Sequence, residues 1–260
     1  MIAIKNLSVS YSAGLMKKKR RSILEDVSFD IQDGETLALI GESGCGKSTL
    51  AKAVLRLIPC DSGDVRLNGV NLSQLRRGPL RVYRKDMQII FQNPESALNP
   101  RMRIYDSIAE MLRIHRLCAP RGQDERARVM ALTEMVGLGA EHLRRYPHEL
   151  SGGQVQRAVL ARILSVRPKF LIADEPTSML DVSVQAQILS LLRRTQAKNR
   201  HACLFISHDL DVVRIISDRI VVLHEGRIVE TGVTDRVLDN PQHEYTSSLI
   251  RQFSQGYVEG

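Results

Sequence analysis

The sequence has no tryptophan, and aromatic residues make up only 4% of its 260 residues. No apolar run approaches the ~18 residues that a membrane-spanning helix needs. The first residues, MIAIKNLSVSY, alternate like a strand and lack the apolar segment of a signal peptide. We therefore expect any membrane role to come through a partner.

Cysteine is also scarce. The four cysteines (Cys45, Cys60, Cys118 and Cys203) lie far apart, and none forms a CxxC pair. This spacing excludes a disulfide framework and a cysteine-based metal cluster, and it indicates a reduced, cytosolic protein.

Charge is plentiful and unbalanced. With 43% hydrophobic and 25% charged residues, the chain has the composition of a folded protein, and its net charge is +8. Two basic clusters contribute much of this charge: Lys17, Lys18, Lys19, Arg20 and Arg21, and then Arg76, Arg77, Arg81, Arg84 and Lys85. Such clusters favour nucleotide, nucleic acid or an anionic membrane face, and each is equally well explained as a solvated loop or an exposed helix face.

The most informative segment is GESGCGKST, residues 41–49, which fits the GxxxxGK[ST] pattern of a phosphate-binding loop. It follows the apolar run Thr36 to Ile40 and precedes a helix-like stretch, Ser48 to Ile58. In such a loop the backbone N–H groups and the helix N-terminus hold phosphate oxygens. We expect Lys47 to reach the β- and γ-phosphates and Ser48 to ligate Mg²⁺. The sequence thus predicts ATP or GTP binding by Gly41, Glu42, Ser43, Gly44, Cys45, Gly46, Lys47, Ser48 and Thr49.

Strand and helix patterns alternate along the chain. The expected strands are 2–11, 27–31, 36–40, 64–67, 87–91, 169–173, 202–206 and 219–223, with a basic loop at 12–22. The expected helices include 124–136, 154–164, 183–198, 209–216 and one amphipathic helix within 244–260. Nearly continuous apolar strands predict a mostly parallel, buried sheet in an α/β fold. We divide the chain into a core (1–92 and 167–232), an inserted helical subdomain (93–166) and a C-terminal tail (233–260).

A pair of acidic residues follows the buried strand Phe170 to Ala173. Asp174 at the tip of that strand is placed to ligate Mg²⁺, and Glu175 is placed to act as general base on the attacking water. Together with the phosphate loop, this pair predicts hydrolysis of the bound nucleotide.

Three motifs in order then carry a family resemblance: LSGGQ (150–154), FLIADEP (170–176) and FISHD (205–209). With the phosphate loop, the chain resembles an ABC-type ATPase from near its first residue to about residue 250. The resemblance implies a P-loop NTPase (RecA-like) core, an N-terminal antiparallel β portion and an inserted helical subdomain. It also implies that two cassettes pack head to tail around two ATP molecules.

The resemblance assigns further roles by position. Ser151, Gly152, Gly153 and Gln154 match the segment that contacts the γ-phosphate held by the opposite cassette, and Asp181 matches the loop that crosses the interface. Tyr11 matches the aromatic residue that stacks on adenine. Gln92 matches the glutamine that touches Mg²⁺ and water, and His208 matches the histidine that contacts the γ-phosphate. The implied catalytic set is Glu175, His208, Gln92 and Lys47, and the implied Mg²⁺ ligands are Ser48, Gln92 and Asp174.

Four longer blocks narrow the resemblance to importers of oligopeptides, dipeptides and nickel: FQNPESALNPRM (91–102), RYPHELSGGQ (145–154), LDVSVQAQIL (180–189) and NPQHEYTSSL (240–249). In the last block, Glu244 stands where that group usually has proline. No cysteine follows Cys203, so we expect no iron–sulfur centre, and this shorter form favours nickel or a nickel–metallophore complex over peptide as cargo.

The implied partners are a second ABC ATPase, two membrane permeases and, indirectly, an extracytoplasmic solute-binding protein. We expect the second ATPase to be a different chain, with a second copy of this chain as the alternative. We expect the chain at the cytoplasmic face of the cell membrane, with residues 93–103 lining the groove for the permeases. One alternative is a soluble ABC ATPase acting on nucleic acid or the ribosome, although its usual second cassette or long insert is missing. Another is an exporter or lipoprotein-release ATPase, which the DVSVQAQ and HEYT blocks argue against.

Overall fold

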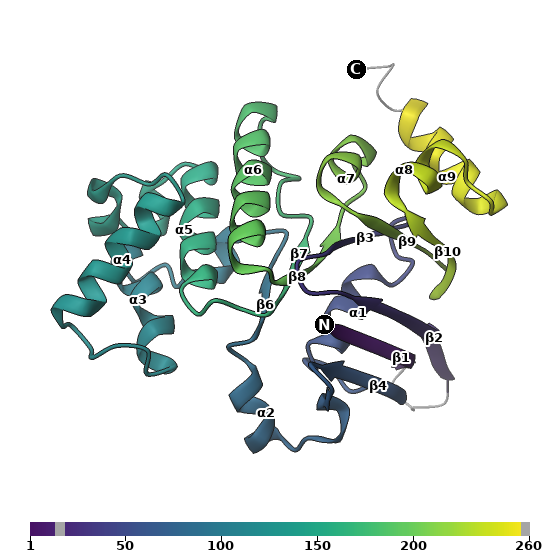
Figure 1. The fold of residues 1–260 in the computed structure, drawn as a ribbon, viewed down its shortest axis with the longest axis horizontal. Helices are drawn as coiled ribbons and strands as arrows, with labels where there is room; N and C mark the ends of the chain where they lie inside the picture. The colour runs from purple at the N-terminus through teal and green to yellow at the C-terminus, as the bar shows by residue number, and fades with distance from the viewer. Residues whose placement is uncertain (14–18, 256–260) are drawn as a thin grey trace. The chain divides into compact units, whose positions relative to one another are not determined.

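The computed structural model describes the backbone of residues 1–13 and 19–255. The chain forms two compact units, residues 1–81 with 200–260 and residues 82–199. Figure 1 shows the elements of both, and each unit is described by itself. The predicted division into a core and a helical subdomain has different bounds and stays a prediction. Within the described residues, no helix combines the length and apolarity that a bilayer span requires.

The first unit begins with an antiparallel sheet in the order β2-β1-β4-β5. Its strands are β1 (Ile2–Ala13), β2 (Lys19–Ile31), β4 (Ser62–Leu67) and β5 (Val70–Asn71). β1 lies centrally, with Ile2 paired to Ile31 on one side and to Leu67 on the other. These three residues are buried, because one face of the sheet packs against the core.

The prediction of a basic loop at 12–22 was wrong at both ends, because β1 continues to Ala13 and β2 begins at Lys19. Strand pairing continues through the Tyr11–Arg21 and Ser12–Arg20 pairs, so part of the basic segment belongs to β2. An exposed antiparallel ladder satisfies the backbone while long charged side chains stay in water, so a run of basic residues does not exclude a strand. Lys17 and Lys18 lie outside the described residues.

A second set of strands in this unit carries its buried core. β3 (Thr36–Ile40) pairs in parallel with β8 (Ala202–Ile206) and with β9 (Arg219–His224), and β10 (Arg227–Val233) pairs antiparallel to β9. β3 and β8 are buried at every residue, as continuous apolar strands predict. β10 was not predicted, because its sequence RIVETGV mixes charged and apolar residues and is only partly buried.

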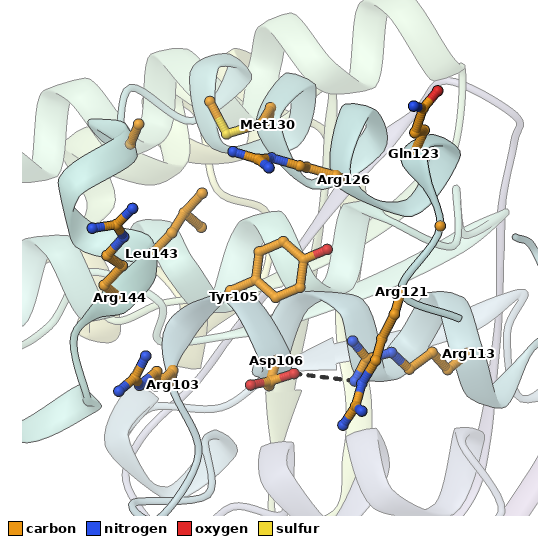
Figure 2. A pocket seen from close by; sticks show the side chains of 12 residues that line it. Arg103, Tyr105, Asp106, Arg113, Arg121, Gln123, Arg126, Met130, Leu143 and Arg144 are labelled. Carbon is orange, nitrogen blue, oxygen red and sulfur yellow. Dashed lines mark hydrogen bonds and ion pairs between the residues drawn. The ribbon is translucent and has the colours of Figure 1, made fainter. Parts of the chain in front are cut away.

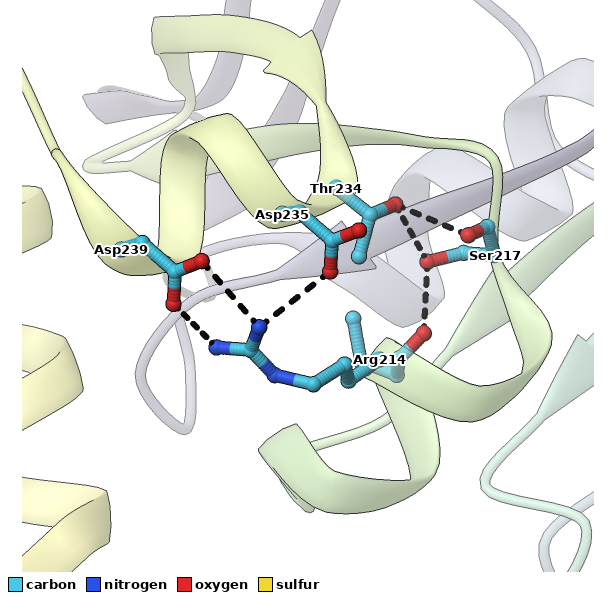
Figure 3. Close-up of polar contacts among 6 residues, drawn as sticks. Arg214, Ser217, Thr234, Asp235 and Asp239 are labelled. Atoms are coloured by element: carbon cyan, nitrogen blue, oxygen red, sulfur yellow. Dashed lines mark hydrogen bonds and ion pairs between the residues drawn. The ribbon is translucent and has the colours of Figure 1, made fainter.

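Helices cover this core. They are α1 (Lys47–Val54), the 3₁₀ turn η1 (Leu72–Gln74), α7 (Leu210–Ile216), α8 (Thr234–Asp239) and α9 (Glu244–Gln255). α1 ends earlier than predicted, because Arg56 has a left-handed backbone with φ of 54°. α8 and α7 are joined by polar contacts, shown in Figure 3: Arg214 pairs with Asp235 and Asp239, and Thr234 donates to the Ser217 carbonyl.

The second unit contains β6 (Met87–Ile90) and β7 (Phe170–Asp174), which pair in parallel. Its main helices are α3 (Ile104–Ile114), α4 (Gln123–Met135), α5 (Gly152–Leu164) and α6 (Val182–Asn199). Shorter turns are η2 (Pro94–Ala97), η3 (Ala140–Arg144) and η4 (Pro147–Glu149), and α2 (Arg77–Tyr83) crosses the boundary between the units along the chain.

A buried carboxylate ties α3 to α4 in this unit. Glu125 is fully buried and accepts hydrogen bonds from the Arg113 guanidinium at 2.7 Å and from the Tyr105 hydroxyl at 3.0 Å. Hydrogen bonding to Arg113 outweighs burial and lowers the pKa of Glu125 to about 2. The two helices therefore share a paired charge.

Candidate nucleotide-binding site

The predicted phosphate loop connects β3 to α1, as expected. Gly46 is the N-cap of α1 with a φ of 114°, and Gly44 has a φ of 83°, conformations that favour glycine. The Lys47 side chain is 9% exposed, and its ammonium donates to the carbonyls of Gly41 at 2.7 Å and Glu42 at 2.8 Å. Ser48 and Thr49 follow in the first turn of the helix. The loop thus gathers a cation and a helix N-terminus, the two features that hold a phosphate.

Neighbouring backbone packs tightly around this loop. A Cβ atom at Gly41 would lie 2.3 Å from the Leu223 carbonyl oxygen, and one at Gly46 would lie 2.9 Å from a methyl group of Leu24. The Gly226 N–H donates to the Cys45 carbonyl at 3.1 Å. The strands flanking the loop therefore fix its path, and side chains are excluded where the backbones meet.

Two further predicted residues lie in the same unit as the loop. His208 is exposed in the turn between β8 and α7, where Asp209 caps α7 by accepting from the N–H groups of Asp211 and Val212. Tyr11 lies on β1 with 45% of its surface exposed, so its ring is available for stacking.

In the second unit, the structure brings Gln92 and Glu175 together. β7 ends at Asp174, and the Gln92 amide Nε2 donates to a Glu175 carboxylate oxygen at 2.7 Å. Glu175 has a left-handed backbone with φ of 47°, which is uncommon for a residue with a side chain and clusters at functional sites. An amide that holds this carboxylate can set the direction in which it accepts a proton.

The LSGGQ segment forms the start of α5. Ser151 is the N-cap and accepts from the Gln154 N–H at 3.4 Å, while the Gln154 side chain accepts from the Ser151 N–H at 3.1 Å. This capping box was not foreseen, although the S-x-x-Q spacing is its signature. Ser151 and Gly152 are exposed, and a Cβ on Gly152 would meet nothing closer than Leu180 at 4.0 Å.

Asp181, predicted in the interface loop, has a local structural role as well. Its carboxylate accepts from the Val184 N–H at 2.9 Å and so caps α6. The large apolar side chains beside it are unusually open: Met179 is 68% exposed and Val182 is 82% exposed.

Sequence reasoning missed two residues beside the phosphate loop. The Tyr245 hydroxyl accepts from the Glu42 N–H at 3.1 Å, and the Tyr245 ring stacks on His224. Tyr245 stood in a recognised block, NPQHEYTSSL, but no pattern linked that block to residue 42.

The comparisons with known proteins agree with one another. A protein-family model described as ABC transporter matches residues 24–178. The chain is 46% identical to the oligopeptide transport ATP-binding protein OppF of Streptococcus mutans, over 96% of this chain and 80% of that protein. It is also 46% identical to the dipeptide transport ATP-binding protein DppF of Lactococcus lactis, with the same coverage. The glutathione import ATP-binding protein GsiA of Escherichia coli is 47% identical, but the chain spans only 40% of its length.

Among solved structures, the ATP-binding cassette MJ0796, a dimer bound to ADP and phosphate, superposes with a TM-score of 0.81 and 27% identity over 90% of this chain and 99% of that one. The predicted α/β ATPase fold is thereby confirmed, as is the resemblance to the oligopeptide and dipeptide importer group. From the loop, the signature helix and these similarities together, the chain belongs to the ABC transporter family and is an ATP-binding cassette that hydrolyses ATP.

Proposed function

We propose that this chain is the ATPase subunit of an importer that carries peptides across a membrane. The observation that carries the proposal is similarity along almost the whole chain, 96% of it, to relatives named for oligopeptide and dipeptide transport. None of the relatives reported above is named for export or for nucleic acid. In this proposal the cassette lies at the cytoplasmic face of the membrane, bound to two permease subunits and served by a solute-binding protein on the other side.

The first half of the proposed site is the phosphate loop. The Lys47 ammonium and the N-terminus of α1 offset the charge of the β- and γ-phosphates, and Tyr11 stacks on the adenine. Gly41 fits this role, because the Leu223 carbonyl and the Cys45 sulfur leave no room for a side chain there and so fix the start of the loop. Mg²⁺, when bound, would neutralise phosphate charge, and Ser48, Gln92 and Asp174 carry the oxygens that suit it.

The second half of the proposed site contains the residues that hydrolyse ATP. Glu175 takes a proton from the attacking water, and its hydrogen bond from Gln92 orients the carboxylate for that transfer. His208 is proposed to contact the γ-phosphate. Since Gln92 touches the general base directly, a change in its position would alter turnover as well as binding.

A second cassette would complete the pocket. Ser151, Gly152 and Gly153 start a 13-residue helix whose exposed N-terminus suits a phosphate from another chain. Met179 and Val182, which flank Asp181 in the sequence, are exposed apolar residues. Such residues are stabilised when a second protein covers them. We propose a head-to-tail dimer, with a different ATPase chain as the natural partner.

The permease contact is proposed in the second unit, next to the predicted groove segment 93–103. A pocket between α3, α4 and η3 has a volume of about 670 Å³. Figure 2 shows the side chains that line it, with Tyr105 near the centre. Its rim carries the exposed arginines Arg103, Arg121, Arg126 and Arg144. Within the described residues, the guanidinium groups of Arg121, Arg126 and Arg144 form no ion pair, so an acidic segment of a permease fits this surface.

We propose peptide as the cargo. The relatives reported above are named for oligopeptides, dipeptides and glutathione, which is itself a short peptide. The prediction of nickel, drawn from chain length, has no counterpart among these names and stays a prediction.

Reconstitution would test the proposal. The chain is co-expressed with the permeases and second ATPase encoded beside it, and the purified assembly is placed in vesicles with its solute-binding protein. ATP-driven uptake of labelled oligopeptide, dipeptide or glutathione is expected, whereas uptake of ⁶³Ni²⁺ alone would replace the peptide proposal. Failure of the chain to co-purify with any permease would reject the importer assignment.

A further inference from the structure

The NPQHEYTSSL block (240–249) contacts the phosphate loop through Tyr245. Tyr245, near the start of α9, accepts a hydrogen bond from the Glu42 N–H at 3.1 Å. Its ring stacks on His224 at the end of β9, with centroids 3.7 Å apart and planes 30° from parallel. Glu42 is the second residue of the phosphate loop, and the Glu42 carbonyl is one of the two that Lys47 contacts. The Glu42 N–H belongs to the same peptide unit as the Gly41 carbonyl, which Lys47 also contacts, and the Glu42 carbonyl belongs to the next unit.

The block around Tyr245 is built to hold this side chain in place. Glu230 on β10 accepts from the N–H groups of Gln242 and His243, and His243 Nδ1 accepts from the Tyr245 N–H. Leu249, one turn further along α9, is buried in the core cluster that includes Ala38 and Ile40 of β3. The Tyr245 ring packs against this same cluster, so its hydroxyl is presented from a fixed base.

The loop has two further anchors, which come from residues 223–226. Gly41 abuts the Leu223 carbonyl, and the Cys45 carbonyl accepts from Gly226. Glu42 itself is exposed, and its amide is bound by a side chain from 203 residues away. A phenol in this position does not ionise at neutral pH, because burial raises the pKa of Tyr245 further.

We infer that Tyr245 is a positioning residue for the phosphate-binding loop: its hydroxyl, braced by His224, fixes the Glu42 peptide and with it the carbonyls that orient Lys47. The inference rests on the proposed binding of ATP triphosphate by this loop. It also gives the NPQHEYT block a role inside the nucleotide site, in addition to helix capping.

Replacing Tyr245 with Phe removes the acceptor and keeps the ring. Losing one hydrogen bond of about 1 kcal/mol corresponds to roughly a five-fold change. We expect amide exchange in the peptide covering 41–46 of the nucleotide-free chain to accelerate about five-fold. We also expect KM for ATP to rise about five-fold while kcat stays within two-fold, because the chemical groups are untouched.

A matched control is Asp239→Asn, which breaks an ion pair with Arg214 in the same unit but touches no loop residue. It should leave exchange at 41–46 and KM unchanged. His224→Ala should reproduce part of the Tyr245→Phe effect by removing the stack, and His224→Phe should restore the original values.

Each outcome decides the inference. Faster exchange together with a raised KM in Tyr245→Phe, and neither in Asp239→Asn, supports it. Unchanged exchange, or faster exchange with an unchanged KM, overturns it. If the unmodified chain bound no ATP, the proposed function would fail, while exchange at 41–46 would still report whether the hydroxyl holds the loop.

Discussion

The phosphate loop and the LSGGQ segment are both proposed anion sites at a helix N-terminus, yet distant parts of the chain hold the first and mainly local hydrogen bonds hold the second. Around the loop, Gly41 and Gly46 have neighbouring atoms within 3 Å of any added Cβ, and a tyrosine from α9 reaches in. Around the segment, Ser151 and Gly152 are exposed, and the local hydrogen bonds of Ser151 and Gln154 come from one capping box. Only Gly153 is crowded there, because a Cβ atom on it would lie 2.7 Å from a methyl group of Val184.

This difference indicates which half of the pocket each chain completes by itself. A loop enclosed by its own chain can hold a nucleotide without a partner, whereas an exposed helix start binds only when another surface supplies the ligand. The phosphate loop is therefore expected to set the affinity for ATP. The LSGGQ segment is expected to make ATP hydrolysis depend on dimer formation.

The largest effect is expected from a change at Glu175, which should nearly abolish hydrolysis without weakening ATP binding by either half of the pocket. Replacing Glu175 with Gln removes the proton acceptor and should lower turnover by about 10²–10⁴-fold, since a general base contributes that much. ATP binding should stay within two-fold, and ATP-dependent dimers should accumulate. Phosphate release and gel filtration measure the two properties. Turnover within ten-fold of the original would reject Glu175 as general base.

The second prediction concerns what supports each half. The loop rests on an apolar cluster, whereas α3 and α4 of the second unit share the buried Glu125–Arg113 pair. Arg113→Met leaves Glu125 buried without its cation and should cost about 3–5 kcal/mol of unfolding free energy. Arg128→Met, which removes an exposed pair with Asp124, should cost less than about 0.5 kcal/mol.

The same pair predicts a pH dependence. Because Arg113 lowers the pKa of Glu125 from 4.5 to about 2, the pair stabilises fully above about pH 4.5, and this contribution is lost as pH falls towards 2. The Arg113→Met variant should lose that dependence. Denaturant titrations between pH 2 and pH 7 measure it, and equal acid sensitivity of both proteins would contradict the assignment.

The third prediction uses matched glycines. Gly41→Ala forces a Cβ against the Leu223 carbonyl, at about 1–3 kcal/mol, and should weaken ATP binding about ten-fold or more. Gly152→Ala meets only Leu180 at 4.0 Å, so the isolated chain should bind ATP normally. Its ATPase activity should still fall, because the added methyl group lies where a partner's phosphate is proposed. Titration calorimetry and turnover assays decide, and normal turnover in Gly152→Ala would exclude a phosphate there.

The smallest effect is expected at Ser151. Ser151→Ala removes an N-cap and should cost about 1 kcal/mol of stability. In the proposed dimer with the second ATPase chain, hydrolysis should be lost at the nucleotide that the partner chain holds and kept at the other site. A control with Asn, which also caps helices, separates the cap from the proposed phosphate contact: stability should recover while turnover at that site stays low.

Local patterns predicted much of the fold, and distant contacts explain the misses. β8 has its predicted bounds, because an apolar run of five residues between polar turns is long enough for a buried strand and too short for a helix. The prediction of a loop at residues 19–22 was wrong, because these residues pair with β1 despite their positive charge. In the site, Gln92 and Glu175 were named separately, but their hydrogen bond spans 83 residues. The Glu42–Tyr245 contact spans 203, and no periodicity reports such a pairing.

Cys45 gives the loop one more property. A thiol in the middle of a nucleotide site would ordinarily expose the enzyme to oxidants and alkylating agents, because thiolates react and thiols do not. Here desolvation raises the pKa of Cys45 and outweighs the nearby Lys47 charge, which keeps the sulfur protonated. The cassette therefore has a cysteine within its phosphate loop that stays in the unreactive thiol form.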